Sequence, residues 1–179
     1  MLLAIIACVY LLVGIGIAQR RRPLYRWQKD TISELGETGA HDARLVNYFI
    51  FLPVGLILLG IPAMHFLQES AQGYNSPLIG LTGCVGVGYV LAAFFPCDPG
   101  SPATGTSRQT VHTLGGFVEY AGGAYFLSQA GENFKYAGIV VMGCAVLISF
   151  NTPWRGAIQR VAEILLFSGI LLMSMGQAL

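Results

Sequence analysis

The sequence predicts an all-α fold, a polytopic membrane bundle of six transmembrane helices with both termini on the non-cytoplasmic side. Three observations predict it. The 179-residue chain is 54% hydrophobic and only 11% charged, whereas a soluble domain carries about 25% charged residues. Six apolar segments reach the length of about 17–25 residues that crosses the hydrocarbon core of a bilayer. The basic residues fall almost entirely into alternate loops.

These segments are expected to form a single transmembrane domain over residues 1–179, with a longer cytoplasmic loop at 19–46. The six spans are predicted at residues 2–18, 47–67, 77–96, 111–130, 134–151 and 161–178. The first span is not a secretory signal, because the arginines at 20–22 follow its apolar stretch instead of preceding it. Within the third span, Gly80, Cys84 and Gly88 recur every four residues and predict tight helix packing.

The distribution of basic residues sets the orientation. With an outside N-terminus, nine of the ten basic residues lie in cytoplasmic loops and one, Lys135, lies outside. The nine are Arg20, Arg21, Arg22, Arg26, Lys29, Arg44, Arg108, Arg155 and Arg160. Because short loops rich in Lys and Arg stay in the cytoplasm, this bias predicts that both termini are outside. The expected location is the cell membrane, most simply a prokaryotic inner membrane, with multiple spans.

Two cytoplasmic loops carry recognisable local signals. Thr31 and Glu34 have the spacing of a capping box, in which a hydroxyl and a carboxylate satisfy free N–H groups at a helix start. Gly36 is expected to stop such a helix quickly. In the next loop, three prolines within residues 96–102 end the third helix abruptly. Asp98 is therefore held where that helix leaves the bilayer.

The fourth predicted helix carries two ionisable residues. His112 and Glu119 are seven residues apart and share a helix face, and Glu119 lies roughly 10–13 Å inward of the helix start. A carboxylate near the midplane costs about 2.5–3.5 kcal/mol and is a functional candidate by default. The structural alternative is a protonated Glu119 that hydrogen-bonds a helix carbonyl, Tyr89 or Tyr125.

The cytoplasmic half of the bundle gathers the candidate ligand-binding residues. They are Ser33, Glu34, Asp98, His112, Arg160 and Glu163. His112 alone is most simply an interfacial residue, but Asp98 at the same membrane level makes an acid–base pair conceivable. Arg160 has three options: it pairs with Glu163, approaches Asp98, or binds an anionic headgroup.

Several chemistries have no signal in the sequence. There is no nucleotide loop, zinc motif or nucleophile elbow. The four cysteines, at positions 8, 84, 97 and 144, show no metal-ligand spacing, so no metal site is predicted. The net charge of +1 gives no reason to expect nucleic acid as a partner. The identity of any cofactor stays open.

Two loop motifs carry a resemblance to a known family. The motifs are Ile32-Ser33-Glu34-Leu35-Gly36 and Phe95-Pro96-Cys97-Asp98, followed by His112 and the stretch from Gly156 to Arg160. Over residues 30–165 they resemble a widespread family of prokaryotic integral membrane proteins of unknown function, itself distantly similar to the DRAM/Sfk-type membrane proteins of eukaryotes. The resemblance implies six helices and one polar constellation on one membrane face, and it implies no activity. That constellation is Ser33, Glu34, Asp98, His112 and Arg160.

Three functions fit these patterns. The first is a binding module or accessory subunit that recognises a lipid headgroup or a membrane-protein partner through the cytoplasmic cluster. The second is a membrane enzyme that acts on a lipid-like substrate, with Asp98 and His112 as acid and base. The third is a proton-coupled transporter in which Glu119 carries the proton.

Overall fold

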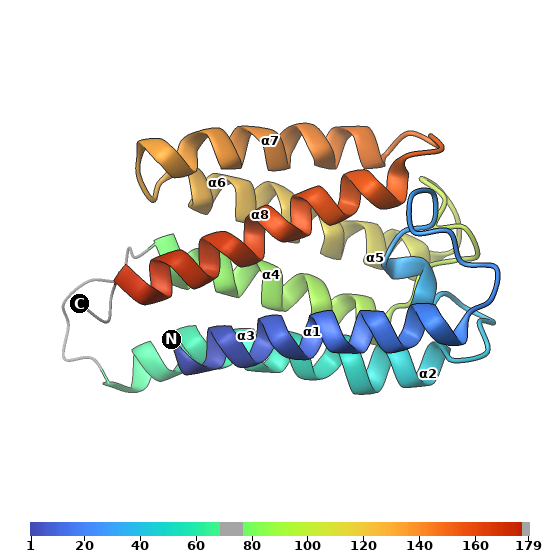
Figure 1. Ribbon diagram of the computed structural model, residues 1–179, viewed down its shortest axis with the longest axis horizontal. Coiled ribbons are helices and arrows are strands. Elements are labelled where there is room, and N and C mark those ends of the chain that lie inside the picture. The colour runs from blue at the N-terminus through green and yellow to red at the C-terminus, as the bar shows by residue number, and fades with distance from the viewer. Residues whose placement is uncertain (69–76, 177–179) are drawn as a thin grey trace.

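The computed structural model describes residues 1–68 and 77–176, and these residues form helices joined by loops, without a strand (Figure 1). The all-α prediction is therefore confirmed for this part of the chain. The elements are α1 (Leu2–Arg21), the 3₁₀ turn η1 (Ser33–Gly36), α2 (Ala43–Val46), the π segment η2 (Asn47–Phe51), α3 (Leu52–Gln68), α4 (Pro77–Phe94), α5 (Ser107–Phe117), the π segment η3 (Val118–Gly122), α6 (Gly123–Ser128), α7 (Glu132–Ile148) and α8 (Arg155–Gly176).

Several of these elements join into longer helices. The chain stays helical from α2 through η2 into α3, and again from α5 through η3 into α6. Six long helices result. The helix predicted over 47–67 begins earlier, at Ala43, and the one predicted over 161–178 begins at Arg155. Residues 177 and 178 of that last prediction lie outside the described residues.

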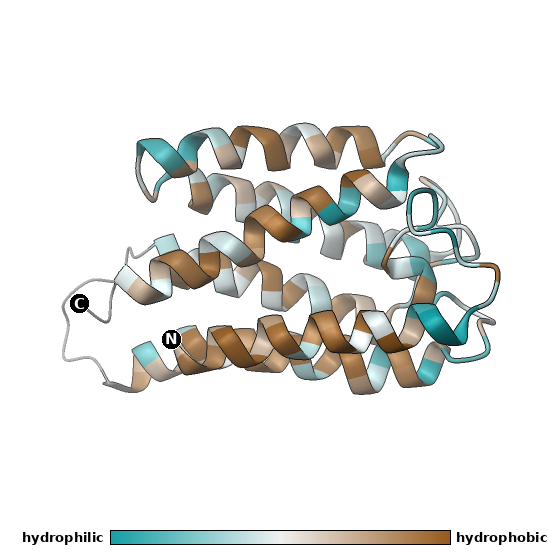
Figure 2. Ribbon diagram, viewed as in Figure 1, coloured by the Kyte–Doolittle hydropathy of each residue, from teal (hydrophilic) through white to brown (hydrophobic). Residues whose placement is uncertain are grey.

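Four helices are long and apolar enough to cross a membrane. They are Leu2–Arg21, Ala43–Leu67, Pro77–Phe94 and Arg155–Gly176. Large apolar side chains on these helices point outward, among them Leu2, Leu12 and Phe49, which are 69%, 70% and 65% exposed. Hydropathy colouring shows the same pattern, with hydrophobic residues along the helices and hydrophilic residues at one end (Figure 2). An exposed apolar surface of this extent is typical of helices that contact lipid.

Helix α4 packs against α3 on one side and against the α5–η3–α6 helix on another. Its small residues make close approach possible. A side chain at Gly86 would meet the Gly55 carbonyl of α3. Side chains added at Gly80 and Gly88 would meet Phe126 and Glu119 of the facing helix. The spacing of small residues in α4 therefore marks a packed face, as predicted.

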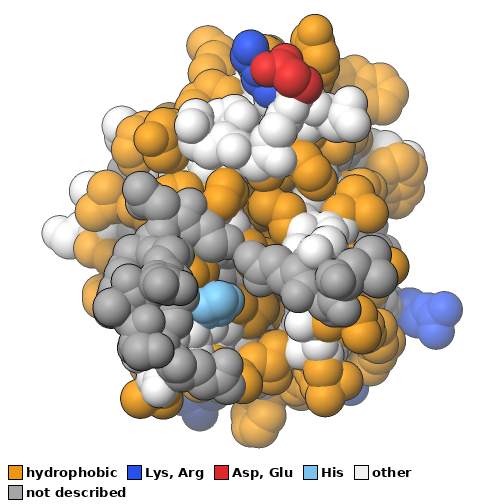
Figure 3. All heavy atoms as spheres, turned by 90° about the vertical axis from the view of Figure 1, so that its left-hand side faces the viewer, with side chains coloured by type: hydrophobic (Ala, Val, Ile, Leu, Met, Phe, Trp, Pro, Cys, Tyr) orange, Lys and Arg blue, Asp and Glu red, His pale blue; other side chains and the backbone are white. Residues whose placement is uncertain are grey.

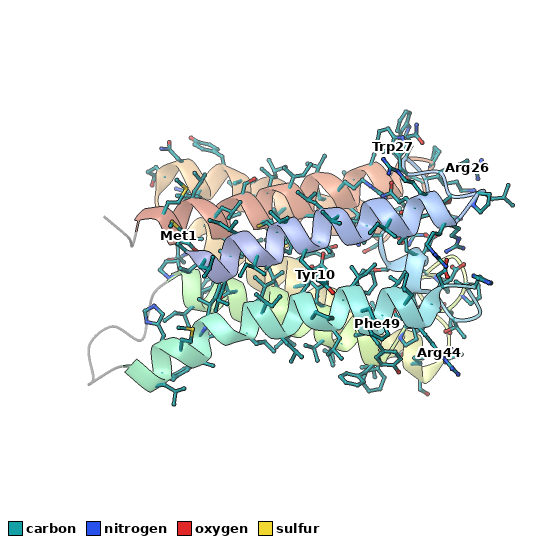
Figure 4. The ribbon with its side chains drawn as sticks, turned by 60° about the horizontal axis from the view of Figure 1, so that its bottom comes forward. Met1, Tyr10, Arg26, Trp27, Arg44 and Phe49 are labelled. Carbon is teal, nitrogen blue, oxygen red and sulfur yellow. The ribbon has the colours of Figure 1, made fainter. Side chains whose placement is uncertain are left out.

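One end of the bundle carries the three connecting segments 22–42, 95–106 and 149–154, and we call it the loop end (Figure 1). Arg26, Trp27 and Arg44 lie there, whereas Met1 lies at the opposite end (Figure 4). The opposite end shows mostly hydrophobic side chains and few charged ones (Figure 3). Among the described residues, the basic side chains are therefore concentrated at the loop end.

Candidate functional site

The first connecting segment folds through the predicted capping box, which is confirmed. The Thr31 N–H donates to Glu34 Oε1 over 3.2 Å, and the Glu34 N–H donates to Thr31 Oγ1 over 3.3 Å. The turn η1 that they start ends at Gly36. There a side chain would collide with the Asn47 amide, which itself donates to the Gly36 carbonyl. Glycine is thus required by the close approach of the chain.

The two motif segments of the sequence pack against each other. The Thr38 N–H and hydroxyl both donate to the Cys97 carbonyl, over 2.9 and 3.0 Å, and the Cys97 thiol donates to the Ser33 carbonyl. Glu37 accepts from the Gly100 N–H at 2.7 Å. Burial raises the pKa of the Cys97 thiol to about 12, so this cysteine is inert at neutral pH.

Arg155 joins the first two connecting segments to the end of α7 at the loop end. Its guanidinium donates to the carbonyls of Gly100 and Ser101 over 3.0 and 2.7 Å, and to that of Ile148 over 3.1 Å. It also lies 3.9 Å from Glu34 Oε1, with the Arg155 side chain only 11% exposed. Burial raises the pKa of Glu34, against the opposing effects of the Thr31 hydrogen bonds and of Arg155. From the sequence, Arg155 was predicted only to be a basic residue of a cytoplasmic loop, because most of its side-chain partners lie far away along the chain.

Asp98 anchors the start of α5. Its Oδ2 accepts from the Thr106 N–H at 2.8 Å, and its Oδ1 accepts from the Thr106 hydroxyl at 2.9 Å and from Arg108 at 3.2 Å. The hydrogen bond from the Thr106 backbone is the largest cause that holds the pKa of Asp98 below its usual value. Both carboxylate oxygens are engaged in positioning the loop and the helix.

Arg160 holds the first connecting segment against α8. It donates to the Trp27 and Asp30 carbonyls over 2.8 and 3.3 Å and to the Tyr25 hydroxyl over 2.6 Å. Among the described residues it forms an ion pair with neither Asp98 nor Glu163. Burial raises the pKa of Tyr25 to about 12, although Arg160 opposes the shift.

A cavity of about 590 Å³ extends from the loop end into the bundle. Its walls come from α4, α5, η3, α7 and α8 and from the three connecting segments. The polar and ionisable side chains of its lining include Ser33, His112, Glu119, Tyr120, Arg155 and Gln159. Phe117 of α5 and Val146 of α7 also line it and are 67% and 55% exposed. The cavity therefore reaches the outer surface between α5 and α7.

His112 lies partly buried in the wall of this cavity. Its Nδ1 is 2.9 Å from the Phe95 carbonyl oxygen. Because a carbonyl only accepts, Nδ1 carries the hydrogen and Nε2 of the neutral ring is left as an acceptor. Glu119 lines the same cavity, so the two residues share a helix face, as their spacing predicts.

A buried hydrogen-bond network lies where the cavity ends. Glu163 accepts from the Tyr120 hydroxyl at 2.7 Å through Oε1 and from the Tyr89 hydroxyl at 3.0 Å through Oε2. Gln159 donates to the Tyr120 hydroxyl over 3.0 Å, and its Oε1 accepts from the Ile32 N–H at 2.6 Å. The network connects α4, η3 and α8 to the first connecting segment. Glu163 was among the predicted ligand-binding residues, whereas Tyr120 and Gln159 were not.

Glu119 is the member of this group that remains incompletely bonded. The π segment η3 carries it, its side chain is 7% exposed, and it interacts directly with Glu163. Its Oε1 is buried and has no hydrogen-bond partner among the described residues. Tyr89 donates to Glu163 instead, and Tyr125 is 59% exposed. A buried acceptor without a donor is costly, and π segments often occur at functional sites.

The fold and the cavity define a class, a helical protein with helices long and apolar enough to cross a membrane and with a cavity of polar and apolar lining at one end of its bundle. Within that class, the chain belongs to the family described as protein of unknown function (DUF998), whose sequence profile matches residues 5–178. The predicted membership in an uncharacterised family is thereby confirmed. Neither the curated proteins nor the solved structures give a significant match.

Proposed function

We propose that this protein is a six-span protein of the cell membrane that binds a lipid-like amphiphile in the loop-end cavity. The observation that carries the proposal is the cavity itself. Its volume of about 590 Å³ falls within the range of about 300–1,000 Å³ that small-molecule sites occupy. It combines polar groups at the loop end with apolar walls where α5 and α7 face the lipid. An amphiphile has the same division into polar and apolar parts.

The six-span topology is part of this proposal. Helix α7 has 17 residues, a length of about 25 Å at 1.5 Å per residue, and it lies beside α8 and α6. The ends of the helices support the orientation. Nine basic residues belong to the connecting segments and helix ends of the loop end, and Lys135 belongs to the other end of α7. Basic loops favour the cytoplasmic side, so the loop end is proposed to be cytoplasmic.

The candidate residues divide into two roles under this proposal. Ser33 and His112 line the cavity and offer a hydroxyl and an imidazole nitrogen to a polar headgroup. Glu34, Asp98 and Arg160 act by holding the connecting segments in place, because their polar atoms already bond to those segments. This division favours binding over the alternative of an enzyme that uses Asp98 and His112, since both Asp98 oxygens are occupied.

Native mass spectrometry of the detergent-purified protein tests the proposal. Gly116 lines the cavity, and a side chain added there meets no atom within 4 Å. Gly116→Phe should fill the cavity without disturbing the core, so the amphiphile retained by the wild type should be lost. Gly143 in α7 is equally unobstructed but does not line the cavity, so Gly143→Phe is the matched control and should retain it.

Two results would overturn the proposal. One is equal retention of the amphiphile by Gly116→Phe and Gly143→Phe. The other is a wild-type protein that keeps no amphiphile even when purified in a mild detergent at low concentration. A single symmetric peak in size-exclusion chromatography for both variants establishes that they are folded.

A further inference from the structure

We infer that the inner end of the cavity binds a monovalent organic cation, a protonated amine with an apolar body, at the carboxyl pair of Glu119 and Glu163, where a proton competes with it. The inference rests on the proposed function because it uses the same cavity, and it names the chemical class of the ligand. Four observations support it: the hydrogen-bond pattern of the two carboxyl groups, the absence of a contacting cation, the free oxygen of Glu119 and the apolar walls.

The hydrogen bonds indicate a pair that shares one proton. Both oxygens of Glu163 accept from tyrosine hydroxyls, which is the pattern of an ionised carboxylate. Glu119 interacts directly with Glu163, and two carboxyl groups in contact hold a proton between them because like charges repel. The pair then carries one negative charge inside the bundle.

No cationic side chain of the described residues contacts this pair. Tyr89 faces it from α4, Tyr120 from η3 and Arg160 from α8, and of these only Arg160 is a cation. The guanidinium of Arg160 donates instead to Tyr25 and to backbone carbonyls. Helix α7 lines the cavity with Met142, Ala145, Val146 and Ile148, none of which is ionisable. A buried charge without a partner is unfavourable, so a ligand with one positive charge would complement the site.

The number of free oxygens selects an amine over a metal ion. Of the carboxylate oxygens of Glu119 and Glu163, Glu119 Oε1 is the one that is buried without a donor among the described residues, whereas hard cations such as Ca²⁺ and Mg²⁺ require about six oxygen ligands. No group of three or more His, Cys, Asp or Glu side chains suited to a metal occurs in the described part of the chain. An ammonium would place one N–H on this acceptor and direct its other N–H groups toward the polar lining of the cavity at Tyr120 and Gln159. Its apolar body would lie against Ala92, Ala121 and Met142.

The exchange balances in charge. When the two carboxyl groups together hold two protons, the pair is neutral, and an ammonium that binds releases one proton through the cavity to the loop end. When the pair holds one proton, the ammonium binds without proton release. His112 and Arg155 line the path toward the loop end. Acid should therefore compete with the amine, and affinity should fall about tenfold per pH unit once the second proton is bound.

Binding of radiolabelled n-octylamine to the full-length protein in phosphatidylcholine nanodiscs tests this inference, with empty nanodiscs as the baseline. Saturable binding of one octylamine per chain is expected. Glu119→Gln should weaken octylamine binding at least tenfold. Glu163→Gln removes the other carboxyl group of the pair and should weaken binding by a similar factor. The control Glu132→Gln removes a carboxylate that is 84% exposed and should bind like the wild type. Uncharged 1-octanol should not displace the amine.

Each opposite result overturns the inference. Octylamine binding by Glu119→Gln and Glu163→Gln that equals wild-type binding would show that the carboxyl pair does not recognise the cation. Displacement by 1-octanol would reduce the site to an apolar cavity. Displacement of octylamine by millimolar Na⁺ would show that the site binds an inorganic cation and not an amine. All three leave the proposed function intact, because that depends on amphiphile retention in the Gly116→Phe comparison.

Discussion

At the scale of single residues, the arrangement around Glu163 explains how a carboxylate is tolerated inside the bundle. Tyr89 and Tyr120 each donate one hydrogen bond to it, and Gln159 donates in turn to Tyr120. A hydroxyl supplies a donor without a charge, so two tyrosines lower the cost of burial and leave the negative charge in place. That remaining charge is the property on which cation recognition depends.

Tyr120→Phe tests the contribution of this network to stability. The change removes one donor to Glu163 and leaves the Gln159 amide unpaired, so we expect a loss of about 1–3 kcal/mol in the free energy of unfolding. Reversible unfolding in mixed micelles with increasing denaturing detergent measures it. Tyr125→Phe alters a tyrosine that is 59% exposed and serves as control. Equal stability of the two variants would contradict a structural network at Glu163.

Asp98→Asn tests the anchoring of α5 through its pH dependence. Because hydrogen bonds from Thr106 and Arg108 hold the pKa of Asp98 below its usual value in the folded protein, the ionised group contributes stability above the ordinary pKa of about 3.9. That contribution is lost as the pH falls through the lower pKa of the folded state. The difference in melting temperature between wild type and Asp98→Asn should therefore be present at pH 7 and shrink below pH 4.

Thermal unfolding in detergent across pH 3–8 gives that difference. Glu132→Gln, at an exposed carboxylate paired only with Lys135 at 3.8 Å, is the control and should remain close to the wild type throughout. A constant difference for Asp98→Asn at every pH would mean that the side chain acts through its shape and not through its charge.

At the scale of elements, each of the two π segments brings a polar group into a position that a regular α-helix would not give it. In η2 the Phe49 carbonyl accepts from the Tyr10 hydroxyl at 2.7 Å and ties α1 to the second long helix. In η3 the extra residue per turn carries Glu119 toward Glu163. Hydropathy does not predict such segments, because they change helix winding without changing which residues are apolar.

The helix ends show why the apolar central part of each helix could be predicted from the sequence and the first residue of the helix could not. Helix α8 begins at Arg155, well before the apolar run, and its polar first turns bond to the first two connecting segments. Helix α5 begins at Ser107 because Thr106 caps it by accepting from the Gln109 N–H at 3.3 Å. Both starts depend on partners far away in the sequence or on a cap outside the apolar segment.

Gly156→Ala tests the docking of the first connecting segment on α8. A side chain at Gly156 would meet the carbonyls of Trp27 and Asp30, and the Gly156 N–H donates to the Lys29 carbonyl over 3.1 Å. Such a contact should cost about 1–3 kcal/mol and expose the segment to trypsin. Gly143→Ala faces open space and should be neutral. Equal trypsin cleavage of both variants would contradict the docking.

At the scale of the whole molecule, the alternation of basic loops allowed the polar residues to be assigned to one end before any contact was known. The tertiary partners were not predictable in the same way. Arg160 and Arg155 are both basic residues at the start of α8, yet only Arg155 lines the cavity. Membership in a family of unknown function was predicted and is confirmed, whereas the loop motifs as marks of that family and the likeness to DRAM/Sfk-type proteins stay predictions.

Cysteine labelling tests the proposed topology. Glu132→Cys and Lys29→Cys place one thiol at each end of the bundle, and both native side chains are exposed. In intact cells a membrane-impermeant maleimide should label Glu132→Cys only, and in inverted vesicles Lys29→Cys only. The wild type is the background control, since Cys8, Cys97 and Cys144 are buried. The proposed topology has an odd number of spans between residues 29 and 132. Labelling of both positions from the same side would therefore contradict it.

The most direct measurement for the central claim is a cryo-electron microscopy map of the wild-type protein in lipid nanodiscs, enlarged by a bound antibody fragment. The account predicts elongated density in the cavity that extends from Ser33 and His112 toward Glu119, between α5 and α7. A map in which α5 and α7 pack directly against each other, with side chains filling the space in front of Glu119, would contradict it.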